Sequence, residues 1–237
     1  MALCENGTKK KLESRNNIEL SHINVIKYLC INGLTEKRMR ENMKTITLAM
    51  QKGGTGKSVI ADQLGYSLKD RGYKVQVLDL DPQQSSVFQN YLEENEEPDF
   101  QIVDTRGALD LGIKMEGSEV SIEDIIEASD LVIIPVLPEN ESIDPLSKIA
   151  RLCESQKANW RIVVNQYDRR HIVDSIIYDD LKTSYTNHVL ETTLSRSEAL
   201  KKARLAKVAV KEIDPKARYA SEFERLTDEI LEAVNGK

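Results

Sequence analysis

Short apolar runs rich in β-branched residues alternate with stretches of helical period from Thr45 onward. The runs lie at residues 45–50, 74–80, 100–104, 131–136 and 161–166. Each is almost continuously apolar, as expected for a parallel strand that is covered on both of its faces. The alternation therefore predicts an α/β fold, with a central, mostly parallel sheet and helices on both faces.

Helical spacing predicts the elements between and after these runs. A crossover helix is expected over residues 58–70, and Ser121 with Asp124 forms a capping-box pattern that opens a short helix ending at Ala128. Near the C-terminus, apolar residues recur at helical spacing, namely Tyr219, Phe223, Leu226, Ile230 and Val234. This stripe predicts a final helix that docks on the rest of the fold through one face.

Residues 1–42 fit the pattern less well, because they contain no strand pattern and little core. They could form two helices around a turn at Asn32-Gly33. Three interpretations stay open: a small helical module, a disordered basic arm, or sequence upstream of the true start, since Met43 directly precedes the first strand. We therefore expect an N-terminal extension, helical or disordered, followed by one main domain at residues 43–237.

Composition excludes several classes of protein. With 40% hydrophobic and 30% charged residues, the 237-residue chain resembles an ordinary soluble protein, and no apolar run is long enough to span a membrane. The N-terminus lacks the apolar segment of a signal peptide, so a cytoplasmic location is expected. Three cysteines without CxxC spacing and three histidines indicate neither a disulfide framework nor a zinc site.

The strongest chemical signal is a glycine-rich stretch between the first predicted strand and the first predicted helix. It reads Gln51-Lys52-Gly53-Gly54-Thr55-Gly56-Lys57-Ser58. Glycines let backbone N–H groups turn towards phosphate oxygens, and the helix that follows adds its positive N-terminal end. In such a loop Lys57 would reach the β- and γ-phosphates and the Ser58 hydroxyl would bind Mg²⁺.

This stretch departs from the usual phosphate loop because Gln51 replaces its first glycine and Lys52 precedes the glycine pair. It resembles the deviant Walker A motif, K-G-G-x-G-K-[ST], of the ParA/MinD family of P-loop ATPases. The resemblance implies a P-loop NTPase architecture, ATP and Mg²⁺ as cofactors, and an ATP-dependent homodimer in which Lys52 reaches the partner's ATP. The ATP-binding residues would be Lys52, Gly53, Gly54, Thr55, Gly56, Lys57, Ser58 and Val59.

Carboxylates follow two of the predicted strands. The stretch that contains Asp79 and Asp81 is similar to the D-x-D-P-Q motif of ParA-type partition ATPases, which implies that Asp81 positions the attacking water and Asp79 supports the magnesium shell. Asp104 ends a strand that resembles Walker B and is the other metal candidate, with Ser58. Arg106 departs from the family's pattern. The predicted catalytic residues are Lys52, Lys57 and Asp81.

Asn165 ends the last predicted strand, and two interpretations of it stay open. It resembles a position that recognises adenine in this family, which would add it to the ATP-binding residues. An asparagine at the end of a strand can equally serve to cap the strand or to turn the chain.

A basic segment near the C-terminus interrupts an otherwise acidic chain of net charge −6. Ser195 and Glu198 could cap a helix there. The candidate DNA-binding residues are Arg196, Lys201, Lys202, Arg204, Lys207 and Lys211. We expect Lys201, Arg204 and Lys211 to share one flank; the alternative is a merely solvated helix face.

The family resemblance then favours a nucleoid-associated ATPase that partitions plasmid or chromosomal DNA. Its partners would be a second copy, non-specific DNA and a centromere-binding, ParB-like adaptor, and no membrane. Iron-protein relatives are disfavoured because Cys153 is the only cysteine after the loop, and the membrane-bound branch because the last helix is acidic. Two alternatives remain: an ATPase that positions a protein cargo over the nucleoid, and a metabolic ATP-dependent ligase.

Overall fold

A computed structural model describes residues 43–80, 86–88, 90–92, 96–105 and 121–236. Its centre is a five-stranded sheet in which every neighbouring pair is parallel, in the order β2-β3-β1-β4-β5. The strands are β1 (Lys44–Leu48), β2 (Val75–Asp79), β3 (Phe100–Asp104), β4 (Leu131–Val136) and β5 (Trp160–Val164). The five predicted strands and their parallel pairing are confirmed.

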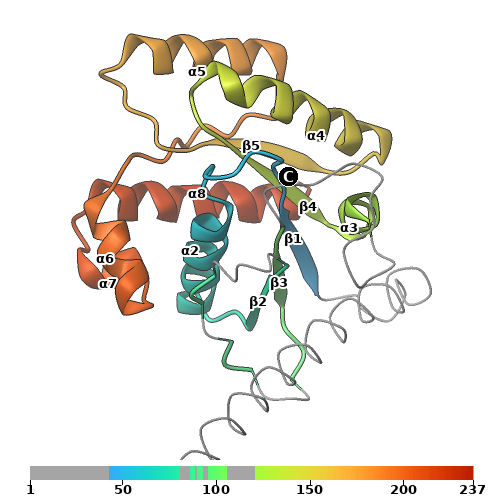
Figure 1. Ribbon diagram of the computed structural model, residues 1–237. Helices are drawn as coiled ribbons and strands as arrows, with labels where there is room; N and C mark the ends of the chain where they lie inside the picture. Colours follow the sequence, from blue (N-terminus) through green and yellow to red (C-terminus); the bar gives the residue numbers. More distant parts are fainter. Residues whose placement is uncertain (1–42, 81–85, 89, 93–95, 106–120, 237) are drawn as a thin grey trace, which may run out of the picture.

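Helices cover both faces of this sheet (Figure 1). They are α2 (Lys57–Asp70), α3 (Ile122–Ala128), α4 (Ile143–Ser155), α5 (Ile172–Ser184), α6 (Glu198–Ala206), α7 (Val210–Ile213) and α8 (Arg218–Val234), with a 3₁₀ turn η1 (Asn140–Ser142) before α4. One apolar cluster joins the sheet to α2, α6, α7 and α8, and a second joins the other face to α3, α4 and α5. The alternation of side chains along a strand explains this arrangement. In β1, Ile46 and Leu48 alternate with Thr47, and both belong to the first cluster.

Two of the predicted helical features are confirmed in detail. The Ser121 hydroxyl accepts the Asp124 N–H at 3.2 Å, and the Asp124 carboxylate accepts the Ser121 N–H at 2.8 Å, which is the capping box. The predicted apolar stripe of the last helix is buried against the first cluster. Local spacing was sufficient for both features because each depends only on residues of its own helix and its cap.

The predicted cap of the basic helix is wrong. Helix α6 has Ser197 at its N-cap position, and that side chain makes no capping hydrogen bond. Ser195 instead donates its hydroxyl and its N–H to the Glu222 carboxylate, at 2.7 and 2.8 Å. Glu222 lies on α8 and is almost fully buried, so a distant carboxylate competes for the serine. The helix still forms, but it begins at Glu198, two residues later than a cap at Ser195 would place it.

Parallel pairing brings the candidate site to one edge of the sheet. In the register of β2, β3 and β1, Asp104 lies opposite both Asp79 and Leu48. The chain leaves all three strands at this carboxyl edge, which is where open α/β sheets bind ligands. Residues 1–42 lie outside the described part, so the extension stays a prediction. In the part that is described, no helix is long and apolar enough to cross a membrane.

Candidate nucleotide-binding site

The loop between β1 and α2 has the backbone geometry of a phosphate cradle. Gly54 and Gly56 have φ of 77° and 95°, in the left-handed region where a side chain is strained. A Cβ on Gly56 would also lie 2.2 Å from the Asn165 Nδ2 atom. Helix α2 begins at Lys57 with no side-chain cap and no acidic residue in its first turn. The positive dipole end of α2 is therefore not capped by a side chain, and it can stabilise an anion that the loop holds.

Three predicted residues converge at the start of α2. Lys57 is buried with 7% exposure, and Asp104 is fully buried at the end of β3. Neither Asp104 carboxylate oxygen has a hydrogen-bond partner of good geometry among the described residues. Burial raises the pKa of Asp104 to about 7, although the nearby Ser58 side chain and the Lys57 charge act to lower it. A buried carboxylate beside a hydroxyl is a donor set that fits Mg²⁺.

Of the two aspartates of the D-x-D-P-Q motif, the structure describes Asp79 only. Asp79 is level with Asp104, and its Oδ2 accepts the Ser86 N–H at 2.8 Å. It is also close enough to raise the pKa of Asp104 through its charge. Asp81 lies outside the described residues, as does Arg106, so the catalytic role of Asp81 stays a prediction.

A further buried carboxylate, Asp62, was missed by the sequence analysis. It lies on α2 with no exposure and accepts the Ser86 hydroxyl at 2.5 Å and the N–H groups of Val87 and Phe88 at 3.1 and 3.0 Å. Burial raises its pKa, while these hydrogen bonds lower it. Asp62 thus attaches the segment that follows the D-x-D-P-Q motif, residues 86–88, to helix α2. An acidic residue amid the apolar positions of the predicted helix was the available signal.

Lys52 forms an ion pair with Glu139, which lies between β4 and η1. The lysine is therefore held within its own chain in this structure, and its predicted contact with a partner's ATP is not tested. Glu139 was not predicted as a site residue. Its signal was its position immediately after the apolar run of β4, at the same edge as the loop.

Asn165 contacts the phosphate loop directly. Its Nδ2 donates to the Thr55 carbonyl oxygen at 2.8 Å, and its Oδ1 accepts the Gln166 N–H at 2.9 Å. With 5% exposure, the side chain both supports the loop and turns the chain at the end of β5. The structural interpretation of Asn165 is thus supported, and an adenine contact is not tested.

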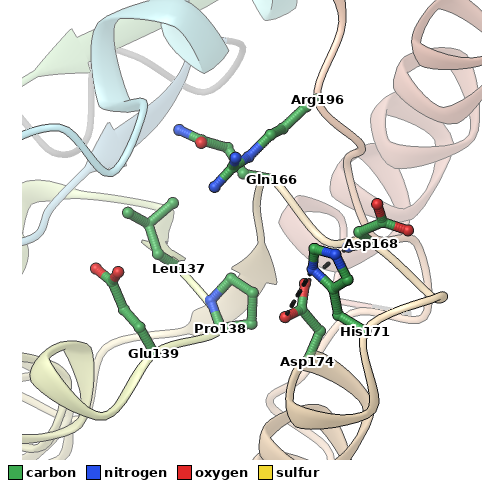
Figure 2. A pocket seen from close by; sticks show the side chains of 8 residues that line it. All are labelled: Leu137, Pro138, Glu139, Gln166, Asp168, His171, Asp174 and Arg196. Atoms are coloured by element: carbon green, nitrogen blue, oxygen red, sulfur yellow. Dashed lines mark hydrogen bonds and ion pairs between the residues drawn. The ribbon is translucent and has the colours of Figure 1, made fainter.

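Two hollows lie beside this edge. The smaller one, of about 100 Å³, is lined by Glu139 and Pro138 after β4, by His171 and Asp174 at the start of α5, and by Arg196 (Figure 2). The larger cleft, of about 730 Å³, adjoins it and is lined by Arg196 and by the starts of α6 and α8. Arg196 therefore belongs to these hollows and not to the basic helix, which begins after it.

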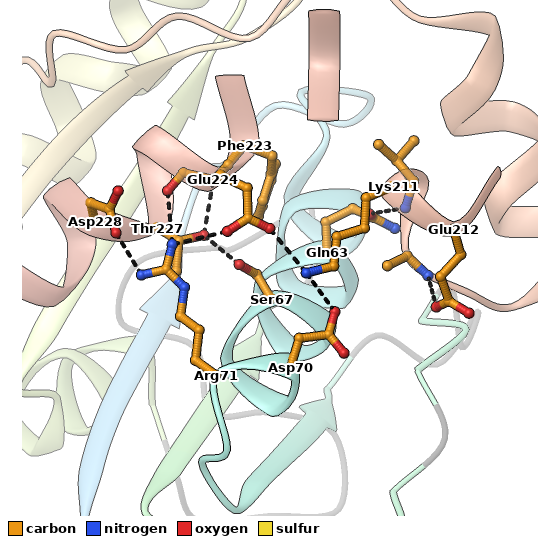
Figure 3. A network of polar contacts seen from close by, with 12 residues as sticks. Gln63, Ser67, Asp70, Arg71, Lys211, Glu212, Phe223, Glu224, Thr227 and Asp228 are labelled. Carbon is orange, nitrogen blue, oxygen red and sulfur yellow. Dashed lines mark hydrogen bonds and ion pairs between the residues drawn. The ribbon is translucent and has the colours of Figure 1, made fainter. Parts of the chain in front are cut away.

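The basic residues are not gathered as predicted. Lys201 and Lys202 are exposed on α6, Arg204 is half-buried there, and Lys207 ends the helix with φ of 57°. Lys211 lies on α7, where it pairs with Asp70 at 2.8 Å and Glu224 at 3.2 Å. The prediction that Lys211 shares one flank of a helix with Lys201 and Arg204 is wrong, because α6 ends at Ala206 and Lys211 lies on α7. Acidic residues of α2 and α8 bind Lys211 there (Figure 3).

The comparisons with known proteins agree with this geometry. A family model described as the CobQ/CobB/MinD/ParA nucleotide binding domain matches residues 46–210. The chain belongs to this family. The predicted ParA/MinD kinship is therefore confirmed, and the family's members are P-loop ATPases.

The curated relatives are distant or partial matches. An uncharacterized protein of Methanocaldococcus jannaschii is 26% identical over 160 residues, which cover 65% of this chain and 51% of that protein. Protein IncC of Escherichia coli is 44% identical over 52 residues, which cover 22% of this chain and 14% of IncC. The chain thus spans about half the length of the first relative and a small part of the second.

Solved structures share the fold over most of the chain. A plasmid partition protein from Borrelia burgdorferi has a TM-score of 0.59 at 18% identity, covering 81% of this chain and 99% of its own. McdA of Cyanothece in complex with ATP has a TM-score of 0.63 at 15% identity, covering 83% and 98%. MinD of Pyrococcus horikoshii in complex with Mg-ADP has a TM-score of 0.59 at 14% identity, covering 79% of this chain and 96% of its own. Neighbours of this fold therefore hold nucleotide and magnesium.

Proposed function

We propose that this protein is an ATPase of the ParA type, which binds ATP with Mg²⁺ on residues 52–59, dimerises and hydrolyses the nucleotide. The observation that carries the proposal is the buried Asp104 carboxylate, whose two oxygens lack partners of good geometry among the described residues beside Ser58. Ser58 and Asp104 would hold the magnesium, which neutralises phosphate charge when bound. Lys57 binds the β- and γ-phosphates, and the α2 N–H groups orient them.

Lys52 and Asp81 complete the proposed chemistry. Lys52 would leave Glu139 and place a second cation on the partner's phosphates, as an arginine finger does. Asp81 would orient the attacking water through its carboxylate, while Asp79 supports the metal shell. Asn165 would close the site beside the base.

Asp81→Ala separates assembly from turnover. We expect ATP-dependent dimerisation to persist while hydrolysis falls about 100-fold or more, because only the attacking water loses its orienting group. Phosphate release and sedimentation velocity with ATP measure the two properties. Asp144→Ala, which removes an exposed carboxylate on α4, is the matched control. Persisting hydrolysis in the Asp81 variant would end the assignment.

The proposal extends to DNA. Lys201, Lys202 and Lys207 are exposed on or at the end of α6, and a dimer would present two such surfaces at once. Joining two weak phosphate-binding surfaces strengthens binding and steepens its dependence on salt. We therefore propose a nucleoid-associated ATPase that partitions DNA, with a centromere-binding, ParB-like adaptor that stimulates hydrolysis. These exposed lysines and the membership of the family support this proposal.

Binding to non-specific duplex DNA with ATP, with ADP and without nucleotide, at two salt concentrations, tests this function. We expect salt-sensitive binding with ATP only. If no nucleotide state binds DNA, the partition function is overturned, and ATP turnover with small carboxylates would then test the ligase alternative. A pull-down that finds a protein cargo would instead favour an ATPase that positions that cargo over one that partitions DNA.

Replacing Lys201 and Lys202 by alanine should weaken DNA binding uniformly across sequences. Each lysine that neutralises a phosphate contributes about one unit to the slope of log affinity against log salt. We therefore expect the slope to flatten by about two units per subunit, with ATP turnover in the absence of DNA unchanged. Lys69→Ala, an exposed lysine on α2, is the control. An unchanged slope in the double variant contradicts a DNA contact by α6.

A further inference from the structure

Residues 86–88 pack on one face of helix α2, which consists of Asp62, Gly65 and Tyr66. These three residues are neighbours on the helix surface because they are three and four positions apart. The Tyr66 and Phe88 rings pack with their centroids 5.0 Å apart. A Cβ on Gly65 would lie 2.8 Å from a carbon of the Phe88 ring, so a larger residue there would push Phe88 away. The fit of Phe88 on α2 thus fixes where this segment lies.

Ser86 lies between two carboxylates that come from different elements. Its N–H donates to Oδ2 of Asp79, at the end of β2, at 2.8 Å. Its hydroxyl donates to Oδ1 of Asp62, on α2, at 2.5 Å. Hydrogen bonds to carboxylates are stronger than those between neutral groups. A polar chain therefore runs from Asp62 through Ser86 to Asp79.

Asp62 accepts hydrogen bonds from three successive residues of this segment. Besides the Ser86 hydroxyl, the N–H groups of Val87 and Phe88 donate to the same fully buried carboxylate. An alanine at position 62 would leave all three donors without this acceptor, and the segment would lose its polar attachment to α2. The position of Ser86, and with it that of the Asp79 carboxylate, therefore depends on Asp62.

The polar chain ends beside the candidate metal site. Asp62 lies one helical turn after Ser58, which with Asp104 would hold the magnesium. Asp62 is also close enough to raise the pKa of Asp104 through its charge. At the other end of the chain, Asp79 is level with Asp104 in the sheet. A change at Asp62 can therefore reach the metal site through Ser86 and Asp79.

We propose that Asp62 is a positioning residue for magnesium, which through Ser86 holds the Asp79 carboxylate where it supports the metal shell. Groups that orient a metal-supporting carboxylate typically contribute roughly 10–100-fold to metal affinity or activity. Orienting Asp79 in advance also lowers the entropy that is lost when the metal binds. This inference rests on the function proposed above, in which Asp79 supports magnesium bound with ATP. Asp62 acts through Ser86 and needs no contact of its own with the metal.

Magnesium titrations of the full chain test this role. Binding of a fluorescent ATP analogue is measured with a chelator and, separately, at increasing MgCl₂, which gives the metal-free affinity and the half-saturating magnesium concentration. We expect Asp62→Ala to raise the half-saturating concentration about tenfold or more and to leave the metal-free affinity within about twofold of wild type. Asp62→Asn keeps an acceptor oxygen for Ser86 but loses the charge, so it should stay within about threefold of wild type.

Ser86→Ala tests the same chain from its middle residue and leaves the buried helix face unchanged. It should raise the half-saturating magnesium concentration by less than Asp62→Ala does, because the N–H groups of Val87 and Phe88 still bond to Asp62. Combined with Asp62→Ala it should add nothing, since both residues act through one chain of hydrogen bonds.

Thr227→Val is the matched control, because it removes a different buried hydrogen bond of α2, the one that Thr227 donates to Ser67. It should lower the melting temperature and leave the half-saturating magnesium concentration unchanged. If wild type does not bind the analogue, or binds it without regard to magnesium, the proposed function fails. If wild type depends on magnesium and Asp62→Ala needs no more of it, the positioning role alone is overturned; should that variant not fold, Ser86→Ala decides in the same way. An asparagine variant as defective as alanine, or an equal defect in Thr227→Val, also overturns it.

Discussion

Lys57→Ala is expected to weaken ATP binding about 100-fold or more and to abolish ATP-dependent dimerisation. Lys57 is buried at the first position of α2, where its ammonium would meet the β- and γ-phosphates in a site with little water. Removing one partner from a buried, hydrogen-bonded charge pair costs about 2–5 kcal/mol, and about 2.7 kcal/mol corresponds to 100-fold. Titration calorimetry with ATP and sedimentation velocity measure the two losses.

The control for this variant is Lys69→Ala, which removes an exposed lysine from the other end of the same helix. Its ATP affinity should match wild type. Thermal unfolding of both variants without nucleotide verifies that they are folded. An unchanged ATP-induced dimer in a folded Lys57→Ala protein would refute the phosphate loop as the nucleotide site.

Asp104→Asn should reduce magnesium-dependent hydrolysis about 100-fold or more and leave the metal-free protein at least as stable as wild type. The two effects have one cause, since a buried carboxylate with no partner of good geometry among the described residues is costly until a cation joins it. The amide removes that cost and also removes a charged magnesium ligand. Steady-state phosphate release, and melting temperatures at pH 8 with a chelator, measure the effects.

Asp130→Asn is a suitable comparison, because Asp130 is a partly exposed carboxylate that pairs with Lys44 at the opposite edge of the sheet. It should not change the magnesium dependence of hydrolysis. A loss of stability in metal-free Asp104→Asn would contradict the view that the carboxylate is strained without its cation. Normal hydrolysis in this variant would remove Asp104 from the metal site.

The sheet and its loop were predictable because their signals are local. Buried parallel strands require continuous apolar runs, so β3 and β4 were predicted with their observed bounds. The loop requires glycines where φ is positive, and Gly54 and Gly56 have that conformation. Parallel pairing then carries Asp79 and Asp104 to the edge that the loop occupies, since strands that run the same way end together.

The contacts that organise the site were not predictable, because they join residues far apart in the sequence. Asn165 donates a hydrogen bond to Thr55, and Glu139 forms an ion pair with Lys52. Glu222 accepts a hydrogen bond from Ser195, which the sequence had predicted to cap α6. The sequence next to these residues does not indicate their partners, since a polar side chain at the end of a helix or strand can form several different local hydrogen bonds. Only packing of the helices on the sheet decides among them.

The attachment of α2 to the C-terminal helix has a consequence for how the protein is made. Ser67 on α2 accepts the Thr227 hydroxyl at 3.0 Å, a buried contact between residues 160 positions apart, and Arg71 bridges to Asp228 and Glu224 (Figure 3). During synthesis the phosphate loop leaves the ribosome long before α8 exists. Helix α2 must therefore wait, with the apolar face that α8 covers still exposed, until α8 has been made. Competence to bind ATP would then arise only after α8 has been made, and ribosome-stalled chains that lack α8 should be substrates for chaperones.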